Sequence, residues 1–95
     1  MAHAFKTEFA QNLYKALISL DNEEDCEAFL TDLCTPKEIK DLSDRWEIAK
    51  LLYTSELSYR DISAKTGAST TTVARVARFL KNEPYEGYKR VLDKK

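Results

Sequence analysis

Residues 58–81 read SYRDISAKTGASTTTVARVARFLK. Ser58, followed three residues later by Asp61, resembles a capping box, so a short helix is expected to begin there. Gly67 readily adopts positive φ and is expected to end that helix, while Ser69 is a suitable N-cap for a second one. The inward face of the second helix is expected to comprise Val73, Val76, Ala77 and Leu80. A short helix, a glycine turn and a helix with one apolar face together predict a helix-turn-helix over about 58–81.

Helix signals continue on both sides of this stretch. Residues 35–38 read TPKE, which combines a capping threonine, a proline at the first helical position and a glutamate that can close a capping box. They predict a central helix over 36–54, which is apolar on more than one side and therefore expected to be buried, with a share in a dimer core. Downstream, Pro84 ends the second helix of the motif, and a short terminal helix is predicted over 85–93. Its expected docking groups are Tyr85, Tyr88, Val91 and Leu92.

Two further helices are expected near the N-terminus. One apolar stripe recurs at helical spacing and comprises Phe5, Phe9, Leu13, Leu17 and Leu20. An acidic break over residues 21–25 separates it from a second helix, whose apolar residues are Cys26, Phe29, Leu30 and Leu33. The chain has 95 residues with two Gly and two Pro, and it shows no repeat and no linker. These features predict an all-α fold in a single domain over residues 1–95.

The net charge of −1 argues at face value against nucleic-acid binding, for which a basic excess is the usual signature. The charge is unevenly distributed, however. Residues 1–57 carry six basic and twelve acidic side chains, whereas residues 58–81 carry five basic side chains against one acidic. The concentrated positive charge therefore coincides with the predicted helix-turn-helix.

Several classes of function are excluded or disfavoured. No apolar run exceeds three residues, so a transmembrane helix or signal peptide is not expected, and the protein is predicted to be cytoplasmic without membrane contact. Cys26 and Cys34 have neither redox nor zinc spacing, and the single histidine, His3, is close to the terminus. With no nucleophile–base pair and no glycine-rich phosphate loop, we expect no enzyme activity, no cofactor and no metal site.

The second helix of the motif is the candidate DNA-reading helix. Its first turn carries three threonines, whose hydroxyls can bond phosphates or bases and whose methyl groups can touch thymine. A helix N-terminus also favours a phosphate. The side chains expected to hold phosphates are Arg60, Lys65, Arg78 and Lys81. Those expected to face the bases are Thr70, Thr71, Ala74 and Arg75, while Ser69 and Thr72 complete the candidate DNA-binding set.

A resemblance to a known family rests on several segments between Asp32 and Lys81. They are LCTPKE at 33–38, Leu42, Arg45, ELSYRDI at 56–62, Gly67-Ala68 and TVAR at 72–75. These residues resemble the Trp repressor superfamily, and most of all its YerC/YecD-type group of small bacterial proteins. The resemblance implies about six helices, an intertwined homodimer and a transcriptional regulator that binds double-stranded DNA, in the first instance as a repressor.

The resemblance also implies a ligand pocket, formed in the Trp repressor around bound tryptophan. Arg45 and Arg75 match the two arginines that flank the tryptophan, and Thr35 matches another pocket residue. Glycine and serine positions of that pocket correspond here to Val76 and Phe79, and a leucine of its wall corresponds to Asp32. Because packed sites do not absorb added volume freely, tryptophan is not expected to bind. We favour the interpretation that side chains of the protein itself fill the space that tryptophan takes in the Trp repressor. The alternative is that a different and smaller ligand binds there.

An adaptor module is the alternative to a DNA-binding regulator. Such a protein would keep the fold without reading DNA and would use the acidic N-terminal half as its docking surface. Binding to genomic DNA fragments at low salt, or capture of one protein partner, distinguishes the two functions.

Overall fold

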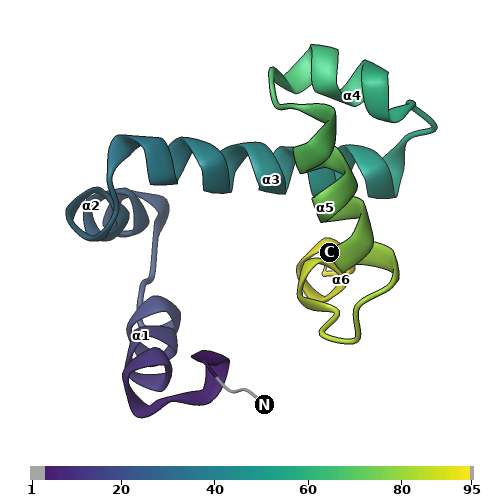
Figure 1. Cartoon of the computed structure of the whole chain (residues 1–95). Helices are drawn as coiled ribbons and strands as arrows, with labels where there is room; N and C mark the ends of the chain where they lie inside the picture. Colours follow the sequence, from purple (N-terminus) through teal and green to yellow (C-terminus); the bar gives the residue numbers. More distant parts are fainter. Residues whose placement is uncertain (1–3, 95) are drawn as a thin grey trace. The chain divides into compact units, whose positions relative to one another are not determined.

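A computed structural model describes residues 4–94, and all of its regular structure is helical (Figure 1). The elements are the 3₁₀ helix η1 (Ala4–Lys6), followed by α1 (Glu8–Ile18), α2 (Glu23–Leu33), α3 (Pro36–Thr54), α4 (Tyr59–Thr66), α5 (Thr70–Lys81) and α6 (Gly87–Leu92). The prediction of an all-α fold is confirmed. His3, the single histidine, lies outside the described residues. The chain divides into two compact units, with the boundary between Ile39 and Lys40 inside α3. That the whole chain forms one domain stays a prediction.

The N-terminal helix is shorter than its apolar stripe predicts. Thr7 has extended backbone angles, and its Oγ1 accepts a hydrogen bond from the backbone N–H of Ala10 at 3.1 Å, so α1 begins at Glu8. Phe5 therefore lies in η1 rather than in the same helix as Phe9. At the other end Ser19 is the C-cap, which leaves Leu20 outside α1. The prediction of one continuous helix through all five apolar residues is wrong at both ends.

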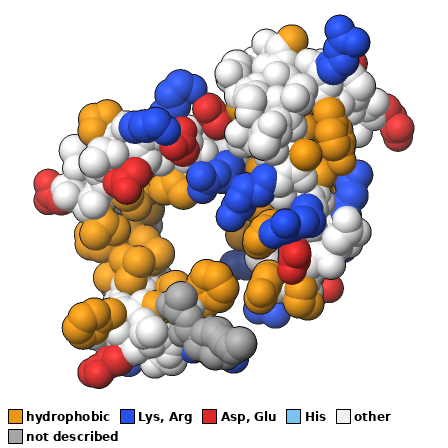
Figure 2. Space-filling view, viewed as in Figure 1, with side chains coloured by type: hydrophobic (Ala, Val, Ile, Leu, Met, Phe, Trp, Pro, Cys, Tyr) orange, Lys and Arg blue, Asp and Glu red, His pale blue; other side chains and the backbone are white. Residues whose placement is uncertain are grey.

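The N-terminal unit buries little of its apolar surface. No described side chain from residues 5 to 39 is buried, and Phe9 and Ile18 are 83% and 84% exposed. Apolar side chains accordingly lie on the surface of α1 and α2 (Figure 2). These helices have a pronounced apolar side without a core to cover it.

The start of α3 follows the predicted capping box. The backbone N–H of Glu38 donates to Thr35 Oγ1 at 3.1 Å, and the backbone N–H of Thr35 donates to Glu38 Oε1 at 2.8 Å. The helix spans the predicted residues, but only its C-terminal half is buried, at Ile48 and Ala49. Leu42 remains 47% exposed. Burial of the central helix is thus present in its C-terminal half, and its share in a dimer core stays a prediction.

The core of the C-terminal unit joins α3, α4 and α5. Ile48 and Ala49 from α3 meet Ile62 from α4 and Val73 and Val76 from α5, and all five have no exposed surface. On α5 the inward stripe is as predicted, since Ala77 and Leu80 are buried as well. The apolar pattern of the helix-turn-helix therefore anchors α5 against α3 and α4.

The terminal helix α6 begins two residues later than predicted. Glu86 has a φ of 60°, in the left-handed region, so the chain turns there and the helix begins at Gly87. α6 packs on α5, and the ring of Tyr88 stacks on Trp46 of α3 at a centroid distance of 6.4 Å. The hydroxyl of Tyr53 on α3 donates a hydrogen bond to the carboxylate of Asp93, just beyond α6. No helix among the described residues is both long and apolar enough to span a bilayer.

Candidate nucleic-acid interface

The turn between α4 and α5 has the geometry that the sequence predicts. Ser58 and Asp61 form both bonds of a capping box, at 3.1 Å and 3.3 Å. Gly67 has a φ of 81°, and its N–H donates to the Ser63 carbonyl at 2.8 Å. α4 therefore ends in the left-handed conformation that favours glycine.

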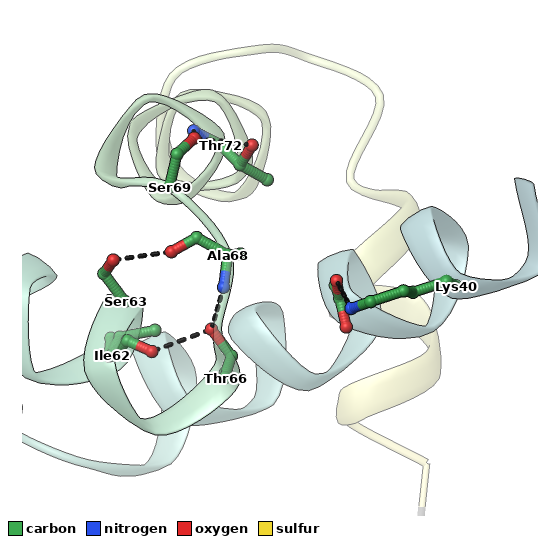
Figure 3. A network of polar contacts seen from close by, with 8 residues as sticks. Lys40, Ile62, Ser63, Thr66, Ala68, Ser69 and Thr72 are labelled. Atoms are coloured by element: carbon green, nitrogen blue, oxygen red, sulfur yellow. Dashed lines mark hydrogen bonds and ion pairs between the residues drawn. The ribbon is translucent and has the colours of Figure 1, made fainter. Parts of the chain in front are cut away.

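Side chains secure the turn in addition to the backbone (Figure 3). The hydroxyl of Ser63 donates to the carbonyl of Ala68 at 2.5 Å, and the hydroxyl of Thr66 donates to the carbonyl of Ile62 at 2.8 Å. The backbone N–H of Ala68 donates in turn to Thr66 Oγ1 at 3.2 Å. Ser63 is half-buried at this turn, whereas the neighbouring Ala64 is exposed. These bonds link the last turn of α4 directly to the residues that lead into α5.

The polar residues in the first turn of α5 have two kinds of surroundings: some cap the helix and others are exposed to solvent. Ser69 Oγ accepts the backbone N–H of Thr72 at 3.1 Å, and the two hydroxyls are 3.1 Å apart. Thr72 is half-buried, whereas Thr70 and Thr71 are exposed. Ser69 therefore caps the helix by accepting the N–H of Thr72, whereas the side chains of Thr70 and Thr71 are exposed.

The basic side chains of α4 and α5 are exposed and largely unpaired. Among residues 4–94, Arg78 alone of this group forms an ion pair, with Glu83 at 3.2 Å. The four that have no ion pair within that part of the chain are Arg60, Lys65, Arg75 and Lys81. Ala74 is exposed on the same helix as Arg75 and Arg78. Figure 2 shows Lys and Arg side chains in the region where Figure 1 places α5.

An aromatic side chain lies beneath two of these arginines. The guanidinium carbons of Arg75 and Arg78 are 4.5 Å and 4.8 Å from the ring centroid of Phe79. The ring of Tyr85 is stacked against Phe79 at a centroid distance of 6.2 Å and an interplanar angle of 18°. Both distances between guanidinium and ring lie in the range of a cation–π interaction.

A cavity of about 250 Å³ adjoins this cluster and is lined by Phe79, Tyr85, Gly87 and Tyr88. The sequence indicated the two tyrosines as docking groups of the terminal helix but gave no indication of a cavity. The two tyrosines line this cavity together with Phe79 because the chain turns at Glu86, and no sequence motif predicts that turn.

The three residues of the expected ligand pocket lie in different units. Thr35 belongs to the N-terminal unit, where it caps α3, while Arg45 and Arg75 belong to the C-terminal unit. Arg45 is half-buried and forms no ion pair with any residue from 4 to 94. Val76 is fully buried in the core, and Phe79 lies under Arg75. Both bulky side chains are thus occupied in contacts within the C-terminal unit.

Potential metal ligands and thiols are also present among the described residues. Residues 4–94 contain no group of three His, Cys, Asp or Glu side chains that could hold a metal ion. Cys26 and Cys34 are free, half-buried thiols.

Comparisons with known proteins agree with this geometry. A family model described as Trp repressor protein matches residues 8–95. YerC from Bacillus subtilis, itself uncharacterised, is 40% identical over 86% of this chain and 77% of its own length. A Trp operon repressor homolog from Xylella fastidiosa is 31% identical over 82% of this chain and 85% of its own length. The crystal structure of a TrpR-like protein from Eubacterium eligens is 42% identical, with a TM-score of 0.86 over 94% of this chain and 90% of that chain. The chain belongs to the Trp repressor family.

Proposed function

We propose that this protein is a sequence-specific DNA-binding transcriptional regulator that acts as a homodimer in the cytoplasm. Of the two modes of regulation, we propose repression. The observation that carries the proposal is the set of four exposed basic side chains on α4 and α5 without ion pairs within residues 4–94. Lys and Arg side chains on a helix-turn-helix that form no ion pair are suited to bind DNA phosphates. Such phosphate contacts supply a large share of the affinity for DNA. The Trp repressor family consists of non-enzymatic regulators, in agreement with the expectation that the chain is not an enzyme.

In the proposed complex the N-terminal end of α5 enters the major groove. Thr70, Thr71, Ala74 and Arg75 then face the bases, and Ser69 and Thr72 keep the first turn of the helix formed. Phosphate contacts fall to Arg60, Lys65, Arg78 and Lys81. Two such helices related by a two-fold axis would read half-sites roughly 34 Å apart.

The second subunit in this proposal is another copy of the same chain. α1 has only 11 residues, a length at which an isolated helix is marginal in water, and its apolar side is exposed in the single chain. Leu33 at the end of α2 and Leu42 on α3 are also exposed. The family fold supports an intertwined two-fold dimer in which these surfaces are covered by the partner subunit.

We further propose that the regulator needs no tryptophan. The proposal is supported by Val76, which is buried in the core where the resemblance places a glycine, and by Phe79, whose ring already lies against Arg75. Isothermal titration of the protein with L-tryptophan should give no binding heat. A saturable signal at micromolar tryptophan would contradict this part of the proposal, and binding of a different, smaller ligand would favour an effector-dependent regulator.

The DNA-binding proposal is tested by in vitro selection of duplexes, followed by titration of the selected duplex at several salt concentrations. We expect a palindrome with half-sites about one helical turn apart. Lys65→Ala should weaken binding and lower the slope of log K against log salt by about two, one phosphate per subunit. Lys50→Ala is the matched control, because it removes the same charge from a lysine already paired with Glu47 at 3.1 Å.

Equal effects of Lys65→Ala and Lys50→Ala would contradict the proposed interface. If selection enriches no duplex and low-salt binding to genomic fragments also fails, the adaptor module becomes the better interpretation.

A further inference from the structure

Phe79 differs from the other apolar residues on the inner side of α5. Val73, Val76, Ala77 and Leu80 are buried, but Phe79 is half-buried and lies outside the buried cluster that joins α3, α4 and α5. Instead its ring contacts two guanidinium groups and the ring of Tyr85. Packing of the core therefore does not account for a phenylalanine at this position.

The cluster restricts two arginines without using up their hydrogen-bond donors. A guanidinium over an aromatic ring interacts through its flat face, so the N–H groups at its edge stay available to a phosphate or a base. Arg75 lies over the Phe79 ring and has no ion pair among residues 4–94, so none of its N–H groups is committed to a carboxylate there. Arg78 commits its Nε to Glu83 but keeps its terminal nitrogens.

Orientation of this kind matters because arginine is among the side chains that lose most rotamer freedom when they are ordered. If the two arginines are held before DNA arrives, less of that entropy is lost on binding. Tyr85 stacks on the ring from the segment before α6 and helps to hold Phe79 itself in place.

We propose that Phe79 is a positioning residue whose ring orients Arg75 and Arg78 for DNA, so that the reading helix is prepared without a bound ligand. This inference rests on the proposed function, because the arginines are oriented toward a DNA ligand. It adds a specific role for one side chain that makes no DNA contact itself. It also predicts that the effect of Phe79 on affinity is exerted entirely through the two arginines.

The test combines Phe79→Leu, which keeps an apolar side chain but removes the ring, with Phe79→Tyr, which keeps the ring. In the free protein, NMR should show upfield ring-current shifts of the Arg75 and Arg78 side-chain protons. Phe79→Leu should abolish those shifts and Phe79→Tyr should retain them. Titration with the duplex selected by the wild-type protein should give about three- to twenty-fold weaker binding for Phe79→Leu and near wild-type binding for Phe79→Tyr.

A double-mutant cycle separates positioning from a general structural effect. In a variant that carries Arg75→Ala and Arg78→Ala, the added change Phe79→Leu should leave the residual affinity unchanged within about two-fold. The inference is overturned if Phe79→Leu does not weaken binding, if it weakens binding equally in the double-alanine background, or if the ring-current shifts are absent. Failure of the wild-type protein to bind any duplex would instead contradict the proposed function, while the NMR measurement would still report whether Phe79 orders the arginines.

Discussion

Gly67 shows how one residue determines the path of the chain between α4 and α5. Its φ of 81° costs an L-residue roughly 1–2 kcal/mol, because the β-carbon approaches the following carbonyl oxygen. A β-carbon added at Gly67 would have no other atom within 4 Å, so the cost of a substitution is confined to the backbone. Gly87 also has open space around it and has no positive φ, which makes it a matched comparison.

We therefore expect Gly67→Ala to lower the free energy of unfolding by about 1–2 kcal/mol. Gly87→Ala should be neutral or slightly stabilising, since alanine is the better helix former at a position within α6. Urea denaturation of both variants at one protein concentration checks this, read from the midpoint at unchanged m-value. Equal losses in the two variants would mean that the left-handed turn at Gly67 does not limit stability.

At the scale of elements, boundaries fixed by local side-chain chemistry could be predicted from the sequence. α3 and α5 begin where Thr35 and Ser69 cap them, and α4 ends at Gly67, all as expected. The start of α1 could not be predicted, because Phe5 fits the helical spacing of the apolar residues that follow it. Periodicity alone does not show that Thr7 is the N-cap and that the helix begins after it.

For the candidate site, the sequence predicted the basic face but not the cluster around Phe79. The exposed cations on α4 and α5 follow from helical spacing, because the opposite face of α5 is apolar. The contact between Tyr85 and Phe79 depends on the path of the chain between α5 and α6. Glu86 in this segment has a left-handed φ, a conformation that glutamate does not favour, so the sequence does not predict the turn.

The hydrogen bond from Tyr53 to Asp93 connects α3 to the chain end after α6 and predicts a dependence on alkaline pH. Because the phenol donates to a carboxylate, and because burial and the carboxylate charge also disfavour the phenolate, the pKa of Tyr53 is raised above its ordinary value of about 10. A pKa raised in the folded state means that the protonated phenol stabilises the fold. This contribution is fully present below about pH 10 and is lost as the pH rises through the higher folded-state value.

We expect Tyr53→Phe to be less stable than wild type at neutral pH and the difference to shrink as the pH rises above about 10. Unfolding free energies of both proteins, measured across that range, test the expectation. Tyr59→Phe is the control, because Tyr59 is a similarly exposed tyrosine at the start of α4. A difference for Tyr53→Phe that stays constant through the alkaline range would show that its hydroxyl does not act through this bond.

At the scale of the whole molecule, the small net charge conceals two oppositely charged parts. Residues 1–57 are strongly acidic, whereas the motif at 58–81 is basic. If the chain binds DNA as proposed, the acidic part repels phosphates and favours orientations in which α4 and α5 face the duplex. Such a protein should hold arbitrary DNA weakly and with a steep dependence on salt.

The N-terminal unit supplies the last prediction. No side chain between residues 5 and 39 is buried, so in the proposed dimer the order of this unit depends on the second chain. For a dimer that unfolds to monomers, each tenfold increase in protein concentration should add about 1.4 kcal/mol to the apparent stability. Phe9→Asp places a charge on the apolar side of α1 and should give a monomer by sedimentation velocity, with stability independent of concentration. Asn12→Asp adds the same charge at an exposed polar position of α1 and should leave the dimer intact. A wild-type protein that sediments as a monomer, with a concentration-independent unfolding midpoint, would contradict the dimer and the two-fold DNA complex built on it.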